Sequence, residues 1–172
     1  TAMLDAGMQG IVFHEFLGIN AKEVESIFDK RMNRISEYKD YEGESNEFVR
    51  HGLSPHSPYS TSVDLYEKIT SYGSLNYWKV ATHLLESPEE SQFLETGGGA
   101  FQKMFEKLES DIDSFEPYGC SPIEFFNQKG ILQKINLAVH CNQTDENDWR
   151  LLRTNGVYVC VCPRSASFFD HY

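Results

Sequence analysis

The chain has 172 residues, enough for one ordinary domain with a hydrophobic core. Its hydrophobic fraction of 40% and aromatic fraction of 13% exclude a disordered tail, and its formal charge of -11 argues against nucleic acid as a partner. No apolar run approaches the roughly 20 residues that a membrane-spanning helix needs, which argues against a membrane partner. The four cysteines fit neither a zinc ribbon nor a disulfide framework, so a reducing, cytoplasmic setting is expected.

The first half of the chain alternates between strand-like and helix-like segments. A strand is predicted over Ile11–Phe16, and apolar residues with helical spacing predict a helix over Ala21–Tyr38. A polar loop is expected over Asp40–Asn46, followed by a brief strand at Gly52–Ser54 that ends at Pro55 and His56. A second helix is predicted to begin near Ser62.

The second half repeats this alternation. Tyr77–Thr82 is predicted to be a strand, and Ser87-Pro-Glu-Glu90 combines a cap serine, a first-turn proline and a glutamate three residues after the serine, which together predict a helix start. Ser121-Pro-Ile-Glu124 repeats that signal, and further strands are predicted over Ile135–Val139 and Val157–Cys162 with a helix over Asp145–Thr154 between them. Cys160 and Cys162 share one face of the last strand, where a packing role is expected.

Strands that alternate with helices, several of them apolar on both faces, predict an α/β fold with a parallel sheet covered by helices. In such folds, functional residues gather at the carboxyl ends of the strands. Polar side chains occupy those places in this sequence: His14, Glu15, His56, His83, Glu86 and His140.

Each of these residues also has a purely structural interpretation. A lone histidine such as His83 is more often hydrogen-bonded to backbone than bound to a metal, and Glu86 suits the start of a helix because the helix dipole favours a carboxylate there. Three histidines at successive strand ends favour a site over three independent structural roles. The spacing alone leaves open whether such a site holds a metal.

Four segments, in order, resemble the amidohydrolase superfamily, in particular its cytosine deaminase-like and triazine chlorohydrolase-like enzymes. Gly52-Leu-Ser-Pro-His-Ser-Pro-Tyr-Ser60 is similar to a G-x-x-P-H-x-P-Y segment, and Thr82-His-Leu-Leu-Glu-Ser87 to an H-x-x-E segment. Leu137-Ala-Val-His-Cys-Asn142 resembles the segment that ends in the second barrel histidine, and Val161-Cys-Pro-Arg-Ser165 the following C-P-x-S.

The resemblance implies a (β/α)8 metallo-barrel of the TIM type, with residues 1–172 forming a segment of one barrel domain, about strands three to seven. It implies that His83 is a metal ligand, that Glu86 is the catalytic acid/base, that His140 is a second catalytic residue and that His56 contacts the substrate. One divalent metal ion is implied, zinc in the first place and iron as the alternative. The first-strand H-x-H pair and the eighth-strand aspartate of the family are expected outside the segment, and Ala166 departs from the asparagine that often follows C-P-x-S.

The function expected on this basis is metal-dependent hydrolysis by an aminohydrolase (deaminase) that acts on a C–N bond of a purine, pyrimidine or related heterocycle. Two alternatives stay open: a chlorohydrolase that uses the same site, and a barrel relative that binds a partner without catalysis. The expected partner is a small heterocyclic substrate. The sequence leaves the oligomeric state open, with a homodimer as the one assembly considered.

Overall fold

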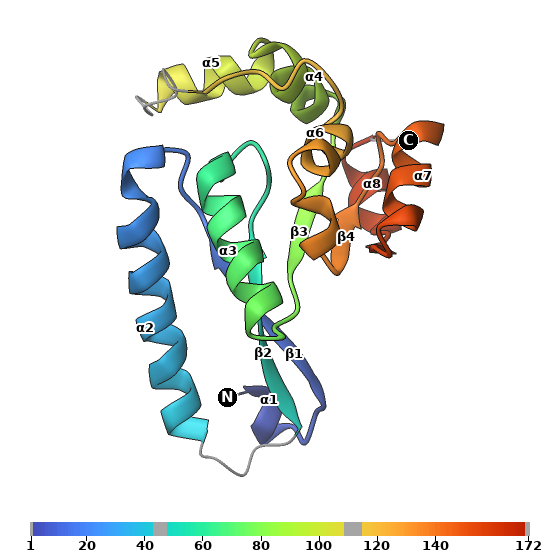
Figure 1. Ribbon diagram of the computed structural model, residues 1–172. Helices are drawn as coiled ribbons and strands as arrows, with labels where there is room; N and C mark the ends of the chain where they lie inside the picture. Colours follow the sequence, from blue (N-terminus) through green and yellow to red (C-terminus); the bar gives the residue numbers. More distant parts are fainter. Residues whose placement is uncertain (1, 43–47, 109–114, 171–172) are drawn as a thin grey trace.

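The computed structural model describes residues 2–42, 48–108 and 115–170, which fold into parallel strands and helices in alternation (Figure 1). The strands are β1 (Gly10–Phe16), β2 (Val49–Pro55), β3 (Ala81–Leu84), β4 (Leu137–His140) and β5 (Tyr158–Cys160). The helices are α1 (Ala2–Asp5), α2 (Val24–Glu42), α3 (Val63–Leu75), α4 (Pro88–Thr96), α5 (Ala100–Lys107), α6 (Pro122–Gln128), α7 (Glu146–Thr154) and α8 (Pro163–Phe168), with short 3-10 turns at Ala21–Glu23 and Leu132–Lys134.

All of the strand pairings in the described part of the chain are parallel. Strand β1 pairs with β2 from Gly10 opposite Val49 to Phe16 opposite Pro55, and β4 lies between β3 and β5. A bridge between Leu53 and Val80 joins the two groups of strands. The strands therefore follow one another in space in chain order, and their carboxyl ends meet at one edge.

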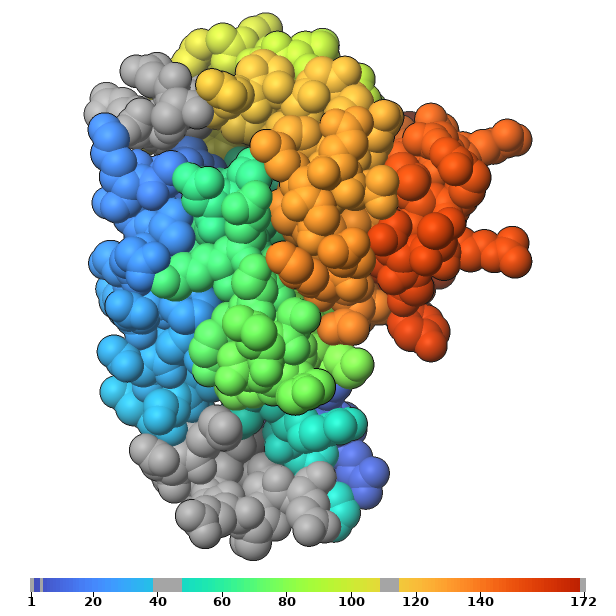
Figure 2. All heavy atoms as spheres, in the orientation of Figure 1, coloured from blue at the N-terminus to red at the C-terminus, as the bar shows by residue number. Residues whose placement is uncertain are grey.

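Helices cover one face of these strands. In Figure 1, α3 lies in front of β2 and α2 stands beside α3 at the left, while α4 and α5 lie together beyond the carboxyl ends of the strands. Figure 2 shows that α2, α3 and the segment through α6 form a continuous surface on this side. The arrangement is the expected one for parallel strands, whose crossover connections place helices on the sheet.

Strand alternation separates the side chains that face the helices from those that face the opposite side. Phe16 and Leu53 pack with α2 and α3 in one apolar cluster, and Leu84 and Ala138 pack with α6 and α7 in another. A cavity of about 550 Å³ lies against side chains from the opposite face of the strands, among them Ser54, Ala81, His83, Leu137 and Val139.

The cap signals read from the sequence are confirmed. The Ser87 hydroxyl accepts a hydrogen bond from the Glu90 amide at the start of α4, and the Ser121 hydroxyl accepts one from the Ile123 amide at the start of α6. Helix α4 ends at Thr96 and is capped by Gly97, whose φ of +75° suits glycine because it has no Cβ.

Several predicted boundaries were wrong. Helix α2 continues to Glu42, so residues 40–42 of the expected loop at 40–46 are helical, and the rest of that prediction lies outside the described residues. Strand β2 is longer than predicted, β3 is displaced toward His83, and β5 is shorter. The packing role of two cysteines is also wrong, because Cys160 is exposed and Cys162 lies beyond the strand. None of the helices in residues 2–42, 48–108 and 115–170 combines the length and apolar composition needed to cross a bilayer.

Candidate active site

The predicted site residues lie together at the carboxyl ends of the strands. The rings of His56 and His83 have centroids 5.0 Å apart, and those of His83 and His140 are 5.5 Å apart. The carboxylate Oε1 of Glu86 lies 3.5 Å from His140 Nε2. Side chains from the ends of β2, β3 and β4 thus form one cluster, as the alternation of strands and helices predicts.

Hydrogen bonds to the backbone and to a serine fix the ring orientations of two histidines. His83 Nδ1 lies 2.9 Å from the carbonyl oxygen of His56, which can only accept, so Nδ1 carries the proton and Nε2 keeps its lone pair. His56 Nδ1 lies 2.7 Å from the Ser60 hydroxyl, which donates its own proton to the Ser57 carbonyl. His56 Nδ1 is therefore also a donor, and its Nε2 is available to a ligand.

The neutral form of His56 is favoured by its surroundings. Burial lowers the pKa of His56, and the nearby His83 lowers it further, while Glu15 and Glu86 oppose both effects. A neutral imidazole is the form that binds a metal or accepts a hydrogen bond from a substrate.

Glu86 is held by a neighbouring residue of its own turn and by two residues from distant parts of the chain. Its amide donates to the Glu90 carboxylate at 2.8 Å, and its carbonyl accepts from Asn142 Nδ2 at 2.9 Å. Its side-chain Oε1 accepts from the Ser165 hydroxyl at 3.3 Å. Ser165 ends the C-P-R-S segment noted in the sequence, but nothing in the sequence pattern indicated this contact across 79 residues.

The backbone is strained at His140 and at the residue directly before Glu86. His140 has a φ of +77° and Leu85, directly before Glu86, has a φ of +52°. Residues other than glycine rarely adopt such angles, and they cluster at functional sites. Strict alternation would point His140 to the helix-covered face with Ala138, whereas its ring lies beside that of His83. The positive φ marks the residue at which β geometry ends.

Of the two polar residues near the end of β1, only Glu15 joins the cluster. His14 points to the other face, where its Nε2 lies 2.7 Å from His51 Nδ1 and its ring stacks on Tyr38 of α2. Glu15 was predicted to lie at the rim, but no role was predicted for it. The alternation of β1, which puts neighbours on opposite faces, is the signal that could have separated the two residues.

Glu15, His56 and His83 form a donor set suited to a metal ion. One potential ligand atom from each of these residues lies within 4.8 Å of the others. Imidazole nitrogen and carboxylate oxygen are ligands that zinc uses in proteins. The residues at this edge therefore fit a divalent ion.

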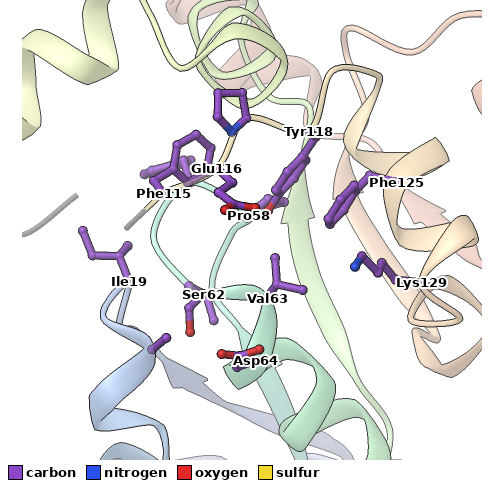
Figure 3. A pocket seen from close by; sticks show the side chains of 14 residues that line it. Ile19, Pro58, Ser62, Val63, Asp64, Phe115, Glu116, Tyr118, Phe125 and Lys129 are labelled. Carbon is purple, nitrogen blue, oxygen red and sulfur yellow. The ribbon is translucent and has the colours of Figure 1, made fainter. Parts of the chain in front are cut away.

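A cavity of about 320 Å³ lies outside this cluster, between the segment after β2, the segment around Tyr118 and helix α6 (Figure 3). The aromatic rings of Tyr118 and Phe125 stack there with centroids 3.9 Å apart. Tyr59 lines the cavity and also meets the His56 ring edge-on, at a centroid distance of 5.8 Å. Tyr59 thus connects the wall of this cavity to the histidine cluster, but none of the predicted site residues lines the cavity.

Comparison with known proteins relates the chain to deaminases by sequence. No protein-family model matches it. The aminodeoxyfutalosine deaminase of Nitratiruptor sp. is 26% identical over 170 residues, which cover 95% of this chain and 38% of that protein. The 5-methylthioadenosine/S-adenosylhomocysteine deaminase of Teredinibacter turnerae is 30% identical over 121 residues, which cover 70% of this chain and 23% of that protein. The chain thus spans less than two fifths of the length of these relatives.

Solved structures show the same fold. The aminofutalosine deaminase of Helicobacter pylori matches with a TM-score of 0.71 at 19% identity, over 94% of this chain and 39% of that chain. A zinc-bound adenosine deaminase from Xanthomonas campestris matches with a TM-score of 0.68 at 19% identity, over 96% of this chain and 33% of that chain. The chain is thus similar in sequence to curated deaminases and shares its fold with solved deaminase structures.

Proposed function

We propose that the complete protein is a metal-dependent aminohydrolase (deaminase) that hydrolyses a C–N bond of a purine, pyrimidine or related heterocycle. The observation that supports this most directly is the contact between Glu86 and His140 beside His83, at the carboxyl ends of neighbouring strands. A carboxylate beside metal-binding histidines is what hydrolysis by an activated water needs. The names of the sequence relatives, which are deaminases of aminodeoxyfutalosine and of 5-methylthioadenosine, agree with this reaction.

The proposal extends to the architecture. We assign β1 to β5 to strands three to seven of an eight-stranded barrel, and residues 1–172 to a segment of that one barrel domain. The order of the described strands, their parallel pairing and the likeness to solved deaminases support this assignment.

His83 is the proposed metal ligand within this chain, and Glu15 and His56 are the groups beside it that suit the same ion. Zinc is the first choice because imidazole and carboxylate suit it and because the Xanthomonas campestris neighbour was solved with zinc. When bound, such an ion lowers the pKa of water so that attack on a ring carbon proceeds near neutral pH. The His83 Nδ1–H bond to the His56 carbonyl orients the imidazole for this role.

Glu86 moves the protons in the proposed reaction. Its carboxylate takes a proton from the attacking water and passes a proton to the amino group of the substrate, so that the bond between the ring carbon and its exocyclic amino nitrogen breaks and ammonia leaves. Water and the aminated ring are thereby converted into the oxo ring and ammonia. His140 lies 3.5 Å from Glu86 and orients this carboxylate toward the water. His56, with Nε2 available, is proposed to contact the substrate.

The two alternatives have less support. A chlorohydrolase would use the same residues with a different leaving group, but the sequence relatives described above are deaminases. A non-catalytic binding protein would have no need of the Glu86 carboxylate, which accepts a hydrogen bond from the Ser165 hydroxyl and lies beside His140.

The test is ammonia release by the complete protein from a panel that includes 5-methylthioadenosine, adenosine and guanine, with metal content measured in parallel. Turnover of one member of the panel, lost on metal removal and restored by zinc, is the expected result. A metal-loaded protein that releases ammonia from no member of the panel would favour the chlorohydrolase or the binding protein.

A further inference from the structure

A buried carboxylate lies directly behind the candidate active site. Glu90, in the first turn of α4, is 2% exposed. Its Oε1 accepts from the Ser57 hydroxyl at 3.1 Å and from the Leu85 amide at 3.2 Å, and its Oε2 accepts from the Glu86 amide at 2.8 Å. Burial raises the pKa of Glu90, and these three hydrogen bonds oppose that effect by favouring the charged form.

These contacts differ from those of a simple helix cap. In a capping box, the glutamate three residues after the cap bonds to the amide of the cap residue itself. Glu90 instead reaches the amides of Leu85 and Glu86, which precede the cap residue Ser87. Leu85 has a φ of +52°, a conformation that is costly for leucine and that the Glu90 carboxylate holds in place.

The same carboxylate also reaches the segment that follows β2. Ser57 is fully buried and directly follows His56 in the chain. The carbonyl of His56 in turn accepts hydrogen bonds from both the amide and the Nδ1 of His83, each at 2.9 Å. One side chain therefore joins the segment that presents His56 to the turn that presents Glu86.

We propose that Glu90 is a positioning residue of this enzyme: its carboxylate fixes the turn that aims Glu86 at His140 and ties that turn to the segment that carries His56. The inference rests on the proposed function. At 2% exposure, and with both carboxylate oxygens bonded within the protein, Glu90 is not placed to contact a substrate, so its effect on the reaction passes through the placement of Glu86 and His56.

The structure makes Glu90→Gln a sharp test, because glutamine has nearly the same shape but only one acceptor oxygen. If the amide oxygen replaces Oε1, the amide nitrogen faces the Glu86 N–H; in the flipped orientation it faces the Leu85 N–H. Either orientation leaves one backbone donor of the turn without its acceptor. The exposed neighbour Glu89 provides the matched control, Glu89→Gln.

The experiment uses the complete protein, with turnover normalised to folded, metal-loaded enzyme and with amide hydrogen exchange measured at Leu85 and Glu86. We expect Glu90→Gln to keep its metal and to lose about tenfold to a hundredfold in kcat, as misplacement of a catalytic group by about 1 Å does. The amide left without its acceptor should exchange faster, while Glu89→Gln should match the wild type in both measurements.

Wild-type kcat in Glu90→Gln, or unchanged exchange at both amides, would overturn the proposal. If the wild type releases no ammonia, the proposed function fails, and the exchange measurement still decides whether Glu90 holds the turn. If Glu90→Gln does not fold, Ser57→Ala replaces it, because it removes only the link to the His56 segment. That variant should raise KM more than it lowers kcat, and an unchanged KM would refute the link.

Discussion

Replacement of Glu86 by glutamine should separate catalysis from folding. The Glu86 side chain is 31% exposed, and its distance of 3.5 Å to His140 Nε2 is long for a hydrogen bond. Such a pair stabilises the fold by at most about 1 kcal/mol. Glutamine can still accept from Ser165, so the thermal midpoint should change little.

Activity should respond far more strongly. Glutamine cannot take a proton from water, and loss of general acid–base catalysis typically lowers the rate by about 10²–10⁴-fold. This corresponds to about 3–5 kcal/mol in the activation barrier. The assay is ammonia release by the complete protein, with metal content and the thermal midpoint measured on the same preparation.

The exposed residue Glu89 again supplies the control, since Glu89→Gln changes the same charge without touching the site. A Glu86→Gln enzyme that holds its metal and turns over at the wild-type rate would refute the acid/base assignment. Loss of metal or of folding by this variant would instead mean that Glu86 has a structural or ligand role.

In the complete protein, His83→Ala should lose zinc affinity as well as activity, because a ligand is removed; unchanged zinc content by elemental analysis would contradict this. Tyr66→Phe removes a buried 2.6 Å hydrogen bond to the Thr82 hydroxyl and should lower the free energy of unfolding by about 1 kcal/mol in denaturant titrations; no loss of stability would show that the bond contributes nothing. Burial raises the pKa of Cys141 to about 12, so its thiol should resist maleimide at pH 8 while the exposed Cys160 reacts, and both should react in urea. Equal labelling rates in the folded protein would show that Cys141 is accessible.

Local sequence patterns predicted the order of strands and helices well. The apolar runs of β1, β3 and β4 and the cap serines of α4 and α6 are encoded by neighbouring residues, so they could be recognised without the fold. The approach of His56, His83 and His140 followed from one general property, that parallel strands bring their carboxyl ends to one edge.

Boundaries were predicted less well where packing decides them. Strand β2 extends back to Val49 because it pairs with β1 along its whole length, although Arg50 and His51 give no strand pattern. Strand β5 is short, its first residue Tyr158 is exposed and so is Val161 directly after it, so the apolar composition of this run did not indicate burial.

The sequence by itself determined the alternation of strands and helices, the polar residues at the strand ends and the four segments that resemble the amidohydrolase superfamily. Only the tertiary structure separated His14 from Glu15, turned His140 toward His83 and brought Ser165 to Glu86. It also showed that Glu90, besides standing in the first turn of α4, accepts hydrogen bonds from the amides of Leu85 and Glu86. Short-range periodicity specifies which residues form a strand or a helix, but contacts between segments far apart in sequence depend on strand register and on strained turns, which no local pattern encodes.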